Sequence, residues 1–105
     1  MAHVVDINSK NPLLGTWKSC DDFSDVHISI DLDRGELRVR AVDTHDGEVA
    51  EIHDIAWVKD QGELTFSAYW KSSGRFTKYR FGTPGSNGRI SVTYTFTAQE
   101  TWEKA

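Results

Sequence analysis

Apolar and polar residues alternate along most of this chain, and the alternation predicts β-strands. The clearest case runs from Val26 to Leu32, where every second residue is apolar. The same pattern recurs over residues 64–70 and 90–97. A period of two residues over tracts of this length is typical of a strand with one buried face and one solvated face. No apolar pattern with the helical period of about 3.6 residues is long enough to predict a helix.

Turn sequences rich in Gly and Asp separate these tracts. Examples are Asp-Arg-Gly at residues 33–35, His-Asp-Gly at 45–47 and Ser-Ser-Gly at 72–74, with a longer loop over 82–88. Gly supplies the positive φ that tight hairpins need, and Asp or Asn supports a turn by bonding its own backbone. The predicted strands span about residues 13–20, 25–32, 36–43, 49–58, 63–70, 75–82, 89–97 and 100–104.

Eight short strands joined mostly by tight turns predict an antiparallel meander. A meander leaves two exposed edges unless it closes into an up-and-down barrel. We therefore predict an all-β protein, an eight-stranded antiparallel up-and-down β-barrel, with an open β-sandwich of the same strands as the alternative. At 105 residues the chain has the length of one domain. We expect residues 1–12 to be an irregular N-terminal lead-in and residues 13–105 to form a single β-barrel domain.

Composition and charge narrow the classes of partner. The chain has 12 basic and 16 acidic residues, a formal net charge of −4, and no large basic cluster. This balance argues against nucleic acid and anionic membranes as partners. No apolar run approaches the roughly 20 residues of a membrane span. Cys20 is the single cysteine, so no intrachain disulfide can form. Because the first residues also lack a secretory pattern, we expect a cytoplasmic location.

One short motif resembles a known family. The sequence Leu14-Gly15-Thr16-Trp17 is similar to the Gly-x-Trp signature that opens the first strand of the calycins, which include lipocalins, fatty-acid-binding proteins and avidins. The resemblance implies a small barrel that holds a small molecule. In lipocalins a basic residue near the end of the barrel packs across the first-strand Trp, and Lys104 is the matching residue here. The helix that follows the barrel in lipocalins has no counterpart in this sequence.

The leading functional hypothesis is non-enzymatic binding of a small hydrophobic or amphipathic ligand inside a lipocalin-like barrel. An eight-stranded barrel has an interior that side chains just fill or that holds one small ligand, so the sequence leaves both a packed core and a pocket open. The side chains predicted to contact a ligand are Trp17, His53, Phe66, Trp70, Tyr79, Tyr94 and Phe96.

The directions of Lys78 and Arg80 affect how polar the interior is, because these residues alternate with Tyr79 and Phe81. If they turned inward, they could clamp a carboxylate or phosphate. Because burying unpaired cations is costly, we expect them to face solvent.

The segment 49–58 does not keep one register, since either face would bury an ionisable group. A β-bulge would resolve this conflict. Glu51 and His53 facing inward would form a polar spot that could orient a ligand or move a proton. We favour a bulge that sends both to solvent, or a His53 whose ring bonds a neighbouring hydroxyl.

Two further hypotheses come from other classes. A protein-interaction module would have a packed core and act through its outer face or its loops, with an exposed apolar patch around Tyr69 or Phe76. An isomerase or cyclase would use Glu51 and His53 as an acid–base pair inside the barrel. We predict no catalytic residue, no metal site and no cofactor, because the histidines show no ligand spacing with Cys20. The oligomeric state is left open.

Overall fold

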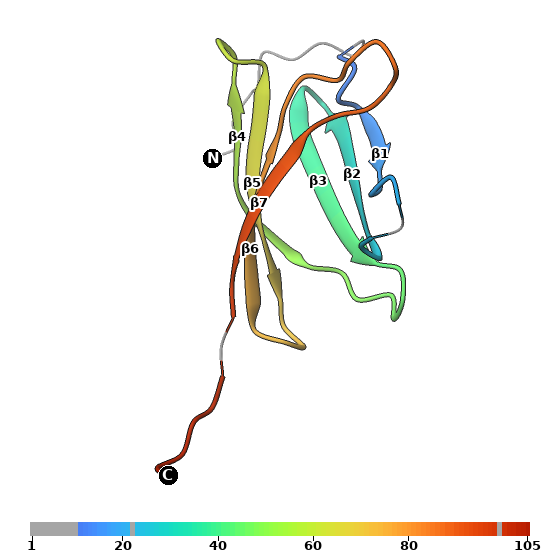
Figure 1. Cartoon of the computed structure of the whole chain (residues 1–105). Coiled ribbons are helices and arrows are strands. Elements are labelled where there is room, and N and C mark those ends of the chain that lie inside the picture. Colours follow the sequence, from blue (N-terminus) through green and yellow to red (C-terminus); the bar gives the residue numbers. More distant parts are fainter. Residues whose placement is uncertain (1–10, 22, 99) are drawn as a thin grey trace.

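Seven β-strands in two antiparallel sheets make up the computed structural model (Figure 1), which describes residues 11–21, 23–98 and 100–105. The three-stranded sheet has the order β1-β2-β3 and the four-stranded sheet the order β4-β5-β6-β7. The three-stranded sheet comprises β1 (Gly15–Trp17), β2 (Val26–Asp33) and β3 (Glu36–Asp43). The four-stranded sheet comprises β4 (Glu51–Val58), β5 (Glu63–Trp70), β6 (Arg75–Phe81) and β7 (Val92–Thr97). The predicted all-β class is confirmed.

The predicted closed barrel of eight strands is wrong for the described residues, which instead fit the alternative, an open β-sandwich. Strand pairing ends at β1 on one side and at β7 on the other. A three-residue β1 cannot supply a ladder along the six residues of β7, so the meander stays open between them. Residues 100–104, predicted as the eighth strand, form no strand. In Figure 1 this C-terminal segment extends away from both sheets.

The two sheets share one hydrophobic core. Its buried members from the three-stranded sheet include Ile28, Ile30 and Leu37, and those from the four-stranded sheet include Phe66 and Phe81. These residues lie on the apolar faces that the alternation predicts. Burial of those faces is the driving force that brings the two sheets together. Among the described residues, the buried apolar ones are Leu13, Ile28, Ile30, Leu37, Ala41, Ala50, Leu64, Phe66, Ala68, Trp70 and Phe81.

The sheets are joined at a corner between β3 and β4. Val42 and Val49 form an isolated antiparallel bridge, and the Ala50 amide donates a hydrogen bond of 3.0 Å to the Ala41 carbonyl. The meander therefore continues through this corner, and its open side lies opposite, between β1 and β7.

The predicted β-bulge in residues 49–58 is confirmed. The pairing of β4 with β5 shifts between His53 and Ala56, and Asp54 has a left-handed φ of 57°. Ile52 before the bulge and Ile55 after it both pack against the core. The extra residue thus switches the inward-facing register of β4 partway along the strand.

Candidate ligand-binding cavity

A cavity of about 680 Å³ lies on the open side of the sandwich. One wall comes from β1, β2 and the segment that follows β1, and the other from β6, β7 and the loop before β7. The volume falls in the range of small-molecule sites, roughly 300–1,000 Å³. The two sheets therefore pack together in a core and also leave a cavity beside it, between β1 and β7.

The structure brings five of the seven predicted ligand contacts to this cavity. They are Trp17, Trp70, Tyr79, Tyr94 and Phe96. Phe66 lies in the core behind them, where its ring stacks on Tyr79 with 5.2 Å between ring centroids. His53 lies on the outer face of β4 and does not line the cavity. Trp17 is held in place by its indole Nε1–H, which donates to the Leu13 carbonyl oxygen at 2.8 Å.

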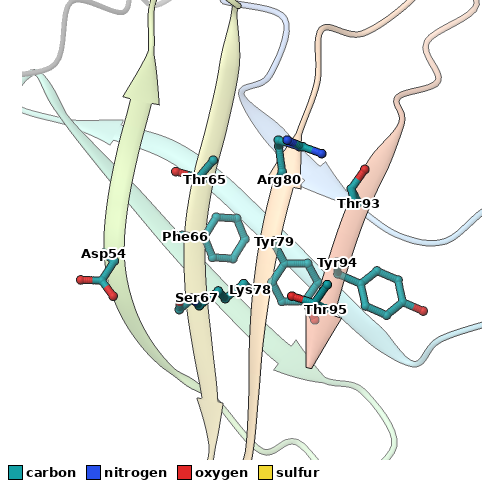
Figure 2. Close-up of a pocket in the computed structure, with 10 residues that line it drawn as sticks. All are labelled: Asp54, Thr65, Phe66, Ser67, Lys78, Tyr79, Arg80, Thr93, Tyr94 and Thr95. Carbon is teal, nitrogen blue, oxygen red and sulfur yellow. The ribbon is translucent and has the colours of Figure 1, made fainter. Parts of the chain in front are cut away.

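A row of aromatic rings crosses β5, β6 and β7. The ring on β5 lies behind the cavity, and the rings on β6 and β7 line it. Phe66 pairs with Tyr79, and Tyr79 with Tyr94, in the β5–β6–β7 register. Figure 2 shows the three rings on neighbouring strands, and the Tyr79 and Tyr94 centroids are 6.0 Å apart. Spacings of this size are those of interacting aromatic pairs. The row therefore gives the cavity a wall of stacked and tilted rings.

The rings become more exposed toward β7. Phe66 is buried, whereas Tyr94 is 48% and Phe96 52% exposed. Both lie on the inward side of β7, and their exposure follows from the missing pairing between β7 and β1. Phe23, on the opposite side of the opening, also lines the cavity and is exposed. Exposed apolar side chains therefore surround the mouth of the cavity.

The inner face of β6 also carries polar groups that were not predicted as site residues. Arg75 and Thr77 line the cavity on the same face as Tyr79 and Phe81. The alternation in residues 75–81 could have identified them, because residues two apart share a face. Thr77 is only 3% exposed. The Arg75 guanidinium lies over the Phe96 ring, 4.5 Å from its centroid, a cation–π contact.

Burial raises the pKa of Tyr79 above its ordinary value of 10.0. Removal of the phenol from water is the main cause, since it disfavours the phenolate. The neighbouring Tyr94 raises the pKa further, and Arg75 opposes the shift. Tyr79, which lines the cavity, therefore stays protonated to a higher pH than an exposed tyrosine.

The predicted polar pair of β4 faces outward, as the bulge requires. His53 Nε2 lies 3.5 Å from Glu51 Oε1, and Lys71 Nζ lies 2.9 Å from Glu51 Oε2. The hydrogen bond from Lys71 is the main cause of a lowered Glu51 pKa. The His53 ring stacks against Phe76 at 6.5 Å. This exposed cluster is on the outer face of the sheet, so the inward acid–base pair that the isomerase hypothesis required does not form.

Lys78 and Arg80 also face solvent, as predicted. They line a shallow outer groove of about 400 Å³ together with hydroxyl side chains of β5 and β7 (Figure 2). Arg80 Nε lies 3.4 Å from Glu63 Oε2. Exposed ion pairs of this kind contribute little to stability. Lys104 is exposed in the extended C-terminal segment, so it does not make the contact across Trp17 that the lipocalin resemblance implied.

The described residues offer neither a metal site nor a membrane-spanning helix. Within residues 11–21, 23–98 and 100–105, no group of three or more His, Cys, Asp or Glu side chains could hold a metal ion. The described part of the chain also contains no helix with the length and apolar character needed to cross a bilayer. Comparisons of the chain with protein-family models, with curated proteins and with solved structures found no match.

Proposed function

We propose that this protein binds a small apolar or amphipathic molecule in the cavity between its two sheets and catalyses no reaction on it. The observation that carries the proposal is the aromatic cavity of about 680 Å³ on the open side of the sandwich. Small-molecule sites are concave, mostly apolar and furnished with a few polar groups that fix orientation. The cavity has this composition, with Thr77 and Arg75 among aromatic and aliphatic side chains.

The uncovered rings at the mouth supply a driving force for binding. Phe23, Tyr94 and Phe96 are all exposed. Removing apolar surface from water is favourable by roughly 25 cal/mol per Å². A ligand that contacts these rings therefore gains binding free energy by covering them. Contiguous exposed apolar surface is typical of ligand-binding grooves and of interaction sites.

The interaction-module hypothesis has less support. It predicts a packed core with no cavity, whereas the sandwich has both a packed core and a cavity on its open side. Phe76, one of the two outer aromatic residues that it singled out, is partly covered by His53. The small-molecule hypothesis therefore accounts for more of the molecule.

The test uses a neutral apolar fluorophore, N-phenyl-1-naphthylamine, whose emission rises when it leaves water. We expect saturable binding to the native protein and weaker binding to Tyr94→Ala, which removes one ring of the cavity wall. The matched control is Tyr69→Ala, since Tyr69 lies on the outward face of β5. Thermal unfolding of both variants checks that they remain folded. Equal affinities of the two variants, or no saturable binding to the native protein, would contradict the proposal.

A further inference from the structure

We propose, resting on the function above, that the ligand is a planar aromatic anion, such as an aromatic carboxylate or sulfonate, whose acidic group binds at Arg75 on the inner face of β6. Two arginines, Arg75 and Arg89, line the cavity, and no Asp or Glu is among its described lining residues. The whole chain, by contrast, carries a net charge of −4. The cavity is therefore a local region of positive charge in an acidic protein, and such a region attracts anions.

Arg75 differs from the arginines of the outer faces in its partners. Arg38 lies 3.3 Å from Asp33, and Arg80 is paired with Glu63. No carboxylate within the described ranges forms an ion pair with Arg75; its guanidinium lies over the ring of Phe96. A ring stacked on a guanidinium uses the flat face of that group and leaves its N–H edge available. That edge matches a carboxylate or sulfonate, which can accept two parallel hydrogen bonds.

The residues next along the inner face of β6 add neutral hydrogen-bonding groups. Thr77 and Tyr79 follow Arg75 at intervals of two residues, so all three side chains project from one face of the strand. Thr77 contributes a hydroxyl in an almost fully buried position. Tyr79 contributes a phenol O–H, which is protonated at neutral pH and can donate a hydrogen bond. One strand thus offers an anion a guanidinium and two hydroxyl donors in a line.

The shape and composition of the remaining lining favour a flat ring over an alkyl chain. Trp17 and Trp70 come from opposite sheets, and Tyr94 and Phe96 from β7. Aromatic rings prefer offset-stacked or edge-to-face partners and gain about 0.5–1.5 kcal/mol per pair beyond area burial. A planar aromatic body makes these contacts, whereas an aliphatic chain makes the area contribution alone.

The experiment compares three probes with one ring system and different charge: naphthalene-2-carboxylate, naphthalene-2-carboxamide and (2-naphthyl)methylammonium. Decanoate serves as the aliphatic anion. Titration calorimetry at neutral pH and low ionic strength measures each Kd. We expect the carboxylate to bind about tenfold more tightly than the amide, the effect of one charge-assisted hydrogen bond. The ammonium should bind more weakly than the amide, and decanoate more weakly than naphthalene-2-carboxylate.

Variants assign the preference to a residue. Arg75→Gln should weaken carboxylate binding about tenfold and amide binding by a much smaller factor, because a neutral carbonyl oxygen accepts a weaker hydrogen bond than a carboxylate. Arg40→Gln removes the same charge from the outward face of β3 and should change neither. If Arg40→Gln had the same effect as Arg75→Gln, net charge and not a contact at Arg75 would explain the preference, and the proposal would be overturned.

The failures of the two proposals are distinguishable. Equal affinity for carboxylate and amide, with both weakened by Tyr94→Ala, would overturn the anion proposal and support binding in the cavity. Decanoate binding as tightly as naphthalene-2-carboxylate would overturn the preference for an aromatic body. No saturable binding of any probe, together with no binding of N-phenyl-1-naphthylamine, would overturn both proposals.

Discussion

Asp54 is the residue on which the register of β4 depends. Its φ of 57° is left-handed, a conformation that Asp tolerates and that β-branched residues strongly disfavour. We expect Asp54→Val to lower the free energy of unfolding by about 1–2 kcal/mol. Asp54→Gly should be neutral or slightly stabilising, because Gly adopts this φ without steric cost. Urea unfolding followed by tryptophan fluorescence measures both changes.

The control for this substitution is Ala56→Val. Ala56 is exposed on the same strand and pairs with Thr65 beyond the bulge, where a β-branched side chain suits an extended backbone. A loss of stability in Ala56→Val as large as that in Asp54→Val would show that volume on this face, and not backbone conformation, is responsible.

The buried phenol of Tyr79 makes stability depend on alkaline pH. Its folded-state pKa is raised above 10.0, mainly by burial. The unfolded chain therefore loses this proton first as the pH rises, so the free energy of unfolding falls above about pH 10 and levels off beyond the folded-state pKa. We expect Tyr79→Phe to be less sensitive to pH in this window than the native protein. Urea unfolding between pH 8 and the alkaline limit measures the difference; parallel pH profiles would contradict it.

At the scale of elements, alternation located the centres of seven strands because a period of two is a local property of the chain. It also located the conflict in residues 49–58, because Ile52 and Ile55 lie on opposite faces in any single register and either face carries an ionisable group. The strand predicted at 100–104 failed for a physical reason. A strand exists only where a partner strand supplies hydrogen bonds. Whether residues 100–104 meet such a partner is decided by the tertiary structure, which a local pattern does not contain.

The same distinction holds for the candidate site. Alternation assigns Tyr79, Tyr94 and Phe96 to the inner faces of their strands. The same rule assigns Arg75 and Thr77 to the inner face of β6. His53 could not be assigned, because its direction depends on which side of it the bulge lies. The presence of empty space depends on how side chains of two sheets fit together, and the sequence carries no local signal for this.

The contrast between Trp70 and Trp102 tests the element assignment. Trp70, at the end of β5, is 6% exposed, whereas Trp102 in the C-terminal segment is 84% exposed. We expect Trp70→Ala to lower the free energy of unfolding by about 3–5 kcal/mol and Trp102→Ala to change it by less than about 0.5 kcal/mol. Chemical denaturation followed by circular dichroism measures both. A large loss in Trp102→Ala would mean that the C-terminal segment packs on the folded domain after all.

At the scale of the whole molecule, the shared core implies that the two sheets unfold together. They are connected by a corner with one isolated bridge, Val42 to Val49, which alone would couple them weakly. The buried cluster, however, contains Ile28 and Ile30 from one sheet and Phe66 and Phe81 from the other. Neither sheet can keep its apolar face covered once the other has opened, so separate opening would expose that face to water.

Phe66→Ala provides the test of this coupling. Phe66 is among the largest fully buried side chains and lies in the four-stranded sheet, and we expect its truncation to lower the free energy of unfolding by about 3–5 kcal/mol. Native-state hydrogen exchange then reports each sheet separately. If the molecule opens as one unit, the most protected amides of β2 and of β6 lose protection by the same free energy. If only β4 to β7 lost protection while β2 kept its native value, the three-stranded sheet would be stable by itself, and the cavity would lie between two independently folded halves and not inside one cooperative domain.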